Sequence, residues 1–345
     1  MKAAFIKDHG DLEHLTVGNL DSPQINPNEV LIETKYGALN HIDIFLIKGW
    51  PGLNLSMPHV IGSDASGVIK KIGSAVSTVD VGDRVTINPG LSCGKCYYCL
   101  SGKQNFCNRF SIMGEHQWGT FSEFFKVPEE NTLLIPTNFS FELAAAAPLT
   151  FLTAWRALTT QANLKQDQFI LIHGAGGGVS TAAIQIAKYL GARVIATTST
   201  DEKMALTKKL GADYIFNYKE NSDFTKEIYI DITKKKGVDV VLDSVGKETF
   251  QNSLRVLRHG GILVTPGATT SAIAEIDIRQ IFWKQLKVIG TTMSSQGEFR
   301  EVMDLIFQNK LKPIVDKVFS LNEVKKAENY LIETQQFGKV LLKIS

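Results

Sequence analysis

The sequence has few of the features that would assign it to a specialised class of proteins. Its 345 residues include only four cysteines, and all four lie between Cys93 and Cys107. No cysteine is left over for a second thiolate site or for a thiol nucleophile. Four thiols packed so tightly in a long chain are also unlike the disulfide framework of a small secreted domain. The net charge is only +2, so long-range attraction gives no reason to expect a nucleic-acid or membrane partner.

Hydrophobic segments of membrane length are missing as well. No run of about 18 apolar residues occurs, so no membrane-spanning helix is expected. The first residues, MKAAFIKDHGD, lack the apolar core of a signal peptide. Free thiols held for a metal suit a reducing compartment, and we therefore expect a cytoplasmic protein. A chain of this length is expected to fold as two domains.

The four cysteines follow the pattern C-x2-C-x2-C-x7-C, with Gly94 and Gly102 easing the turns between them. Zinc binds four thiolates as a tetrahedron that leaves no open position. The alternative is an iron–sulfur cluster, whose bacterial ferredoxin run ends in an x3 gap and Cys-Pro, whereas here the last gap is seven. The pattern predicts one structural zinc per chain, in a lobe at about residues 88–112, with ligands Cys93, Cys96, Cys99 and Cys107.

The pattern of apolar residues changes along the chain. Up to about residue 140, short apolar runs alternate with glycine and proline, which indicates a compact mixed-β domain. From Gln168, apolar strands such as FILIH alternate with helical segments such as GVSTAAIQIAKYLGA. This alternation predicts βαβ units and a parallel sheet. The strands expected after Thr292 need not join that sheet, and can instead return to the first domain.

A glycine-rich turn follows the strand FILIH and precedes a helix. A backbone that approaches a pyrophosphate closely cannot carry a Cβ, and a helix N-terminus offers free N–H groups. The strict G-x-G-x-x-G pattern is not met, because Val179 occupies the place of the last glycine. The strand–turn–helix context still predicts a dinucleotide site at Gly174, Gly176, Gly177, Gly178 and Val179.

The tip of the next strand indicates which dinucleotide is preferred. An NAD-selective site places a carboxylate there, but this chain has Thr197–Thr200 and no carboxylate before Asp201. A hydroxyl-rich tip leaves room for a 2′-phosphate, which favours NADP(H) over NAD(H). The candidate cofactor contacts here are Thr198, Ser199, Lys203 and Tyr218. The competing interpretation is that Lys203 is an ordinary solvated helix residue.

The chain resembles the medium-chain dehydrogenase/reductase superfamily, which includes zinc alcohol dehydrogenases and quinone oxidoreductases. The resemblance spans the whole chain and rests on the cysteine lobe, the glycine turn, VGDRV (81–85), APLTFLTAW (147–155) and FGKVLLKI (337–344). It implies an α/β protein with a GroES-like mixed-β catalytic domain (1–147 and 293–345) and a Rossmann domain with a doubly wound parallel sheet (148–292). It further implies an active site between the domains and a homodimer or homotetramer.

The departures from the family bear on the chemistry. Zinc alcohol dehydrogenases hold a catalytic zinc with a cysteine, a G-H-E histidine and often a second cysteine. Asn40 stands in the place of the first cysteine, Ser63 in the place of the histidine, and Thr150 lies in the segment that matches the second. The N-H-x-D pattern instead resembles the zinc-independent quinone oxidoreductases. A catalytic zinc with other ligands stays open, and the candidates for it are His41, Asp43, Asp64, Glu115 and His116.

We expect Asn40 and His41 to bind the substrate oxygen or to position water, and Asp43 to hold His41 or the loop. The alternative for Asp43 is a turn-capping carboxylate. Aromatic residues form cores more often than pockets, but an apolar substrate pocket is expected from Phe45, Trp50 and Phe151. The resemblance implies nicotinamide contacts by Thr150, Thr153, Gly338 and Lys339.

Three functions stay open from the sequence. The first is an NADPH-dependent reductase of quinones or α,β-unsaturated carbonyls, because conjugated acceptors need least help in the absence of a metal. The second is a zinc-type alcohol dehydrogenase that interconverts alcohols and aldehydes or ketones. The third is a nucleotide-binding protein without enzymatic activity, because fold does not settle function. The expected partner is a small carbonyl, quinone or alcohol.

Overall fold

The computed structural model describes residues 1–221 and 223–345, and the chain divides into two compact units. The first unit contains Met1–Leu149, Ser294–Asn309 and Pro313–Ser345. The second contains Thr150–Met293 and Lys310–Lys312. Within the described ranges, none of the helices combines the length and the apolarity that crossing a bilayer requires.

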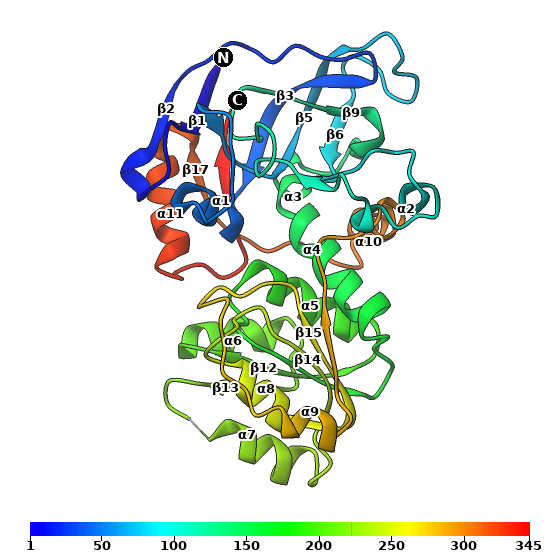
Figure 1. Ribbon diagram of the computed structural model, residues 1–345, viewed down its shortest axis with the longest axis vertical. Coiled ribbons are helices and arrows are strands. Elements are labelled where there is room, and N and C mark those ends of the chain that lie inside the picture. Colours follow the sequence, from blue (N-terminus) through cyan, green and yellow to red (C-terminus); the bar gives the residue numbers. More distant parts are fainter. Residues whose placement is uncertain (222) are drawn as a thin grey trace. The chain divides into compact units, whose positions relative to one another are not determined.

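The first unit is built on a sheet of seven strands around the long strand β3 (Glu29–Ala38) (Figure 1). The strand order is β10-β6-β5-β3-β18-β17, and β9 also pairs with β3. Two smaller sheets, β2-β1-β4 and β7-β8, complete the strands of this unit. The bounds of the other strands are Lys2–Ile6 (β1), Leu15–Asn19 (β2), His59–Val60 (β4), Asp64–Ile72 (β5), Arg84–Ile87 (β6), Gly90–Leu91 (β7), Ser111–Ile112 (β8), Phe124–Pro128 (β9) and Thr132–Leu134 (β10).

The end of the chain returns to this first sheet. Strand β18 (Lys339–Lys343) pairs antiparallel with β3, so that Leu341 lies opposite Ala38. Strand β17 (Val315–Ser320) then pairs parallel with β18. The return matters for the site because it places Lys339 beside the segment that follows β3.

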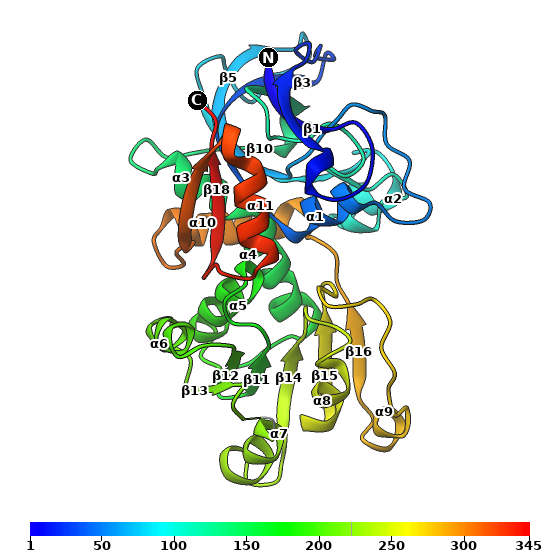
Figure 2. The same cartoon turned by 90° about the vertical axis from the view of Figure 1, so that its left-hand side faces the viewer.

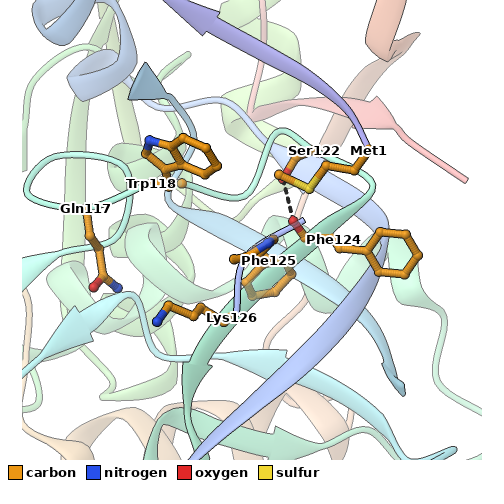
Figure 3. A pocket seen from close by; sticks show the side chains of 9 residues that line it. Met1, Gln117, Trp118, Ser122, Phe124, Phe125 and Lys126 are labelled. Carbon is orange, nitrogen blue, oxygen red and sulfur yellow. Dashed lines mark hydrogen bonds between the residues drawn. The ribbon is translucent and has the colours of Figure 1, made fainter. Parts of the chain in front are cut away.

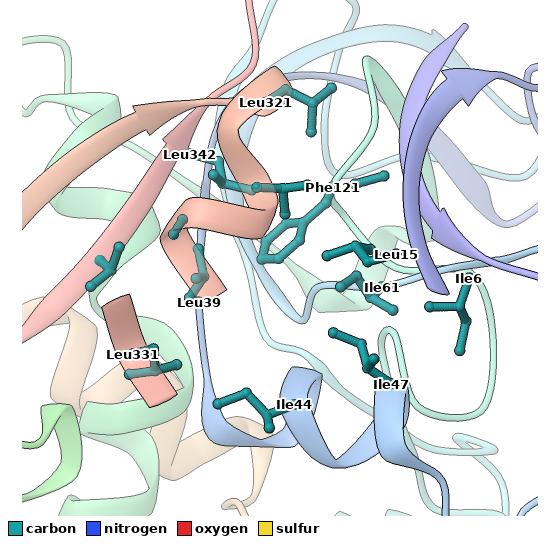
Figure 4. Packing of buried hydrophobic residues seen from close by; sticks show 14 residues of the cluster. Ile6, Leu15, Leu39, Ile44, Ile47, Ile61, Phe121, Leu321, Leu331 and Leu342 are labelled. Atoms are coloured by element: carbon teal, nitrogen blue, oxygen red, sulfur yellow. The ribbon is translucent and has the colours of Figure 1, made fainter. Parts of the chain in front are cut away.

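Two helices of the first unit, α1 (His41–Lys48) and α11 (Val324–Ile332), pack on one apolar cluster (Figure 4). Ile44 and Ile47 come from α1, and Leu331 comes from α11. Helix α1 begins after Asn40, whose backbone N–H donates to the side chain of Asp43 at 2.8 Å, as in one half of a capping box. The other helices are α2 (Tyr97–Leu100), α3 (Phe141–Ala146) and α10 (Gln296–Phe307), and α4 (Pro148–Trp155) contains the boundary between the units.

The second unit is a parallel sheet of six strands in the order β13-β12-β11-β14-β15-β16 (Figure 2). The chain runs outward from β11 to β13, and then resumes at β14 on the other side of β11. The resulting switch point between β11 and β14 is where doubly wound sheets bind ligands. The bounds are Phe169–Ile172 (β11), Arg193–Thr198 (β12), Tyr214–Asn217 (β13), Val238–Leu242 (β14), Leu257–Thr265 (β15), Lys287–Gly290 (β16), Gly178–Tyr189 (α5), Asp201–Lys209 (α6), Phe224–Glu227 (α7), Phe250–Val256 (α8) and Arg279–Trp283 (α9).

Candidate cofactor, substrate and metal sites

The four cysteines converge in the lobe. Their Sγ atoms all lie within 4.8 Å of one another, and Cys99 Sγ lies 3.9 Å from Cys93 Sγ and 3.5 Å from Cys96 Sγ. Gly94 and Gly102 both take positive φ, as the turns between ligands require. Backbone N–H groups of Lys95 and Cys96 lower the pKa of the Cys93 thiol to about 6. The geometry therefore brings together every ligand that the spacing predicts.

This arrangement fits zinc. Zinc–sulfur bonds of about 2.3 Å in a tetrahedron separate the sulfur atoms by about 3.8 Å, close to the separations in the lobe. All four donors are thiolates, and they come from one short stretch of chain. A metal held here has no open position for substrate, so its role is to stabilise the lobe.

The glycine turn lies at the carboxyl edge of the second unit's sheet, between β11 and α5. Gly174 takes φ +65°, and its N–H approaches the hydroxyl of Thr197 on β12 at 3.3 Å. Helix α5 begins directly after Gly177. Ser180, where a glycine is usual, donates its hydroxyl to the carbonyl of His173 at 2.8 Å. The serine therefore fits the close packing between helix and strand that a glycine would allow.

The tip of β12 carries the hydroxyl groups that the sequence singles out. Thr198 is buried, and its carbonyl accepts a hydrogen bond from the N–H of Tyr218 at 3.0 Å. Ser199 is half-buried, and Thr200 caps α6 by accepting from the N–H of Lys203 at 3.2 Å. The structure thus brings Thr198, Ser199, Lys203 and Tyr218 to the same end of neighbouring strands. Their contact with a cofactor stays a prediction.

The segment around Asn40 forms a buried polar cluster in the first unit. The amide of Asn40 donates to Ala38 O at 3.2 Å and to Asp64 Oδ2 at 2.9 Å. Lys339 Nζ donates to Asn40 Oδ1 at 2.6 Å, to Leu39 O at 2.7 Å and to Asp64 Oδ2 at 3.2 Å. Both amide N–H groups of Asn40 and all three N–H groups of Lys339 are therefore already used within the protein.

Two more carboxylates lie in this interior. Asp43 and Glu328 are fully buried, and Asp43 Oδ2 accepts from the N–H of Asn40 at 2.8 Å. Burial raises the pKa of Asp43 to about 7, and burial together with the negative charge of Asp43 raises that of Glu328 well above its usual range. Burial lowers the pKa of Lys339, although Asp64 opposes this shift. One buried ammonium therefore faces more carboxyl groups than it can neutralise.

The remaining candidate ligands of a catalytic zinc are Asp64, Glu115 and His116, and each interacts with other groups of the protein. Asp64 Oδ1 accepts from the N–H of Leu149 at 2.9 Å, while Oδ2 is held by Asn40 and Lys339. His116 Nδ1 accepts from the N–H of Ile112 at 3.3 Å and lies 3.6 Å from Glu115. Among residues 1–221 and 223–345, the four cysteines are the only cluster of three or more such side chains placed to hold a metal ion.

His41 differs from its two neighbours in the predicted catalytic trio. It is partly buried, and neither ring nitrogen makes a hydrogen bond in the described part of the chain. Burial and the nearby ammonium of Lys339 lower its pKa to about 4. The imidazole is therefore neutral at neutral pH and keeps one N–H to donate.

The predicted apolar pocket and nicotinamide contacts come from both units. Phe45 and Trp50, in the first unit, are exposed, whereas Phe151, in the second, is buried together with Thr150 and Thr153. Gly338 takes φ +104°, and a Cβ there would lie 2.5 Å from Ile314 O, so its backbone explains the glycine without a ligand. The roles of these residues toward substrate and cofactor stay predictions.

Sequence reasoning missed two groups of buried polar residues. Glu328 lies on an amphipathic helix, where a carboxylate is normally solvated. His173, Asp243 and Ser253 lie within or beside apolar segments of the second unit and are linked to one another. The available signal was a charged or imidazole side chain at a position where the apolar pattern predicts a buried residue.

A cavity of about 170 Å³ also occurs in the first unit (Figure 3). Met1, Trp118 and Phe125 line it, and the Trp118 indole N–H donates to Pro58 O at 2.9 Å. None of the predicted site residues is among its lining, so it adds nothing to the candidate chemistry.

Comparison with known proteins places these sites in a family. The family described as "Alcohol dehydrogenase GroES-like domain" matches residues 26–137, and "Zinc-binding dehydrogenase" matches residues 178–308. An alcohol dehydrogenase of Geobacillus stearothermophilus is 32% identical, with 100% of each chain covered. An acryloyl-coenzyme A reductase of Metallosphaera sedula is 30% identical, with 99% of each chain covered.

A solved structure gives the same result for the fold. The crystal structure of an NAD-dependent alcohol dehydrogenase is 40% identical, covers 100% of both chains and has a TM-score of 0.96. Together with the GroES-like sheet and the doubly wound parallel sheet, these findings confirm the resemblance and the fold class. The chain belongs to the medium-chain dehydrogenase/reductase superfamily and is an NAD(P)-dependent oxidoreductase.

Proposed function

We propose that this protein reduces quinones or α,β-unsaturated carbonyl compounds with NAD(P)H, and that its one metal is the structural zinc of the cysteine lobe. The observation that carries the proposal is the environment of Asn40. Asn40 stands where zinc alcohol dehydrogenases have a cysteine ligand, and its side chain is held by Asp64 and by the ammonium of Lys339. A buried cationic group of the protein itself therefore occupies this cluster.

The acceptor class follows from the charge that must be stabilised. Bound NAD(P)H supplies the hydride, and negative charge then develops on the acceptor oxygen. A conjugated acceptor spreads this charge, so it needs fewer donors than an isolated ketone. We assign the donor role to the neutral imidazole of His41, because the N–H groups of Asn40 and Lys339 are already used. With a pKa of about 4, the His41 imidazole is neutral at neutral pH. It therefore donates a hydrogen bond to the acceptor oxygen but does not transfer a proton to it.

We propose NADP(H) as the preferred cofactor, supported by the absence of a carboxylate at the tip of β12 before Asp201. The name of the similar solved structure assigns NAD to that protein, which makes the preference a matter for direct measurement.

We also propose a homodimer or homotetramer. The support is an exposed apolar face at the edge of the second sheet, where Phe282, Trp283 and Val288 lie on α9 and the terminal strand β16.

The second candidate is the alcohol dehydrogenase activity that the names of two similar proteins carry.

One experiment separates the two candidate functions. Oxidation of NADPH and NADH is followed with a panel of quinones and enones, and reduction of NADP and NAD with primary and secondary alcohols. Zinc per chain and molar mass are measured on the same preparation. We expect fast enone or quinone reduction, slow alcohol oxidation, a preference for NADPH and one zinc per chain. Rapid alcohol oxidation, or two zinc ions per chain, would overturn the proposal.

A further inference from the structure

A line of buried polar groups runs beneath the carboxyl edge of the second unit's sheet. His173 directly follows β11, and its side chain is buried. Its Nδ1 lies 3.2 Å from the hydroxyl oxygen of Thr197 on β12, and its Nε2 lies 3.0 Å from that of Ser253 on α8. Ser253 in turn lies 2.7 Å from Asp243 Oδ2, just after β14. The line therefore connects three neighbouring strands.

The positions of the protons follow from counting donors. The single hydroxyl proton of Ser253 goes to Asp243, so Ser253 must accept from His173 Nε2–H. Asp243 is held as an acceptor, because its other oxygen receives the N–H groups of Val245 and Gly246, both at 3.0 Å. Burial lowers the pKa of His173, with Asp243 opposing the shift, which favours the neutral ring.

The other end of the line is then determined as well. A neutral ring with its proton on Nε2 has an unprotonated Nδ1, which accepts the hydroxyl proton of Thr197. The lone pairs of the Thr197 hydroxyl are turned to the N–H of Gly174 at 3.3 Å, and Thr197 O accepts from Ala175 N–H at 2.8 Å. The first amides of the glycine turn are thus anchored on a threonine whose orientation is set by His173.

We propose that His173 is a positioning residue for the dinucleotide, which sets the glycine turn through the directed hydrogen bonds Thr197→His173→Ser253→Asp243. The three strands that the line joins are β12, β11 and β14, and parallel sheets bind nucleotides at the carboxyl ends of such strands. His173 acts on cofactor affinity through Thr197 and does not itself touch the cofactor. The inference depends on NAD(P) binding alone, so it can succeed or fail whatever the acceptor class is.

The test compares cofactor affinity in variants that keep side-chain volume. Thr197→Val removes the hydroxyl, and His173→Phe removes both ring nitrogens while keeping an aromatic ring against Phe224. Loss of one directed hydrogen bond corresponds to about a ten-fold rise in Kd. We expect a rise of this size for NADPH or NADH in each variant, measured by fluorescence titration, with little change in kcat at saturating cofactor. Thr197→Ser should restore the wild-type Kd.

Two further measurements distinguish positioning from a general loss of stability. Thr233→Val is the matched control, because it removes a buried hydroxyl of the same unit whose partners, Ile228 O, Tyr229 O and the N–H of Gly237, are not candidate cofactor contacts, and it should leave Kd unchanged. The double variant Thr197→Val/His173→Phe should have the same Kd as the single variant that binds the cofactor more weakly, because both changes break the same chain of hydrogen bonds. Additive effects in the double variant would overturn the proposal. So would lowered unfolding stability with an unchanged Kd in both single variants.

Discussion

Two regions of the first unit collect side chains that bind cations, and they differ in where the cation comes from. In the lobe, Cys93, Cys96, Cys99 and Cys107 converge, and their four sulfur atoms lie within 4.8 Å of one another. Around Asn40 the cation is the ammonium of Lys339, which lies 3.2 Å from Asp64 Oδ2 and is 4% exposed. A cation bound in the lobe would therefore come from solution, whereas the Asn40 cluster contains its own.

The two regions also differ in what else holds them together. Between residues 93 and 107 only Cys99 and Cys107 are buried, and the apolar side chains of Tyr97 and Leu100 are exposed. The chain neighbours of Asn40 and Lys339, Leu39 and Val340, instead belong to the apolar cluster on which α1 and α11 pack (Figure 4). A metal bound by the cysteines would thus be the main source of order in the lobe, while in the Asn40 cluster charge pairing is added to an existing core.

The largest expected effect comes from breaking the metal site. Cys99→Ser removes a buried ligand, and zinc bound by four protein ligands contributes about 10–16 kcal/mol of coupled binding and folding in isolated peptides. We expect loss of the zinc, and amide hydrogen exchange in residues 93–107 approaching that of an unfolded chain, while β3 and β5 keep their protection.

The matched control is Leu100→Ser, an exposed position on the same short helix, which should keep one zinc and wild-type exchange. Protected amides in zinc-free Cys99→Ser protein would show that the lobe folds without metal. The contrast between the two regions would then fail.

The next effect comes from removing the internal ammonium. Lys339→Met leaves the buried carboxylate of Asp64 without its cation, and breaking a buried pair in this way costs about 3–5 kcal/mol. The same change at Lys188, whose 2.9 Å pair with Asp213 is partly exposed, should cost about 0–1 kcal/mol. Both values are obtained from urea unfolding.

A second change shows whether the unpaired charge is the cause. Asp64→Asn combined with Lys339→Met removes both charges, so the double variant should be more stable than Lys339→Met alone. If the double variant is less stable than either single variant, packing and not charge dominates this cluster.

The same contrast explains what the sequence could predict. Three of the lobe's ligands lie within seven residues, Cys93–Cys99, so spacing alone predicts their convergence. The strand–helix alternation from Gln168 likewise predicts the parallel sheet, because each βαβ unit is local. The sequence also marks Asn40 as a departure from the zinc alcohol dehydrogenases, and its part in substrate binding stays a prediction. The structure adds that its amide N–H groups are already used.

What could not be predicted depends on contacts between distant segments. The Asn40 cluster joins residues that are 299 positions apart, and no periodicity in a single sequence indicates such a pair. The sequence alone predicts that Glu328 is a solvated helix residue, and its burial becomes evident only when α11 is placed against α1. His173 reads as the end of an apolar strand until Thr197 and Ser253 are placed beside its ring.

The smallest expected effect concerns the buried carboxyl groups of the Asn40 region, which outnumber its one ammonium group. Asp43 has a pKa of about 7, and that of Glu328 lies well above its usual range, so folding retains protons that the unfolded chain has lost. Stability from these groups is fully present below their unfolded pKa values, and is lost as pH rises through the folded ones. Each proton held only by the folded state changes stability by about 1.4 kcal/mol per pH unit.

Glu328→Gln removes one of these protons from the balance and also relieves the repulsion on Asp43. We expect the variant to gain stability over wild type at pH 8 more than at pH 5, measured by urea unfolding at both values.

His41, with a pKa of about 4, affects the stability of the protein in the opposite direction, because its contribution is lost as pH falls below the pKa of the unfolded chain. Because His41 is common to both proteins, the difference between variant and wild type isolates the carboxyl group. Glu333→Gln, an exposed change just after the same helix, should show no such pH dependence. An equal gain at both pH values would mean that Glu328 keeps an ordinary pKa in the folded protein, and that Lys339 neutralises its surroundings more completely than the geometry indicates.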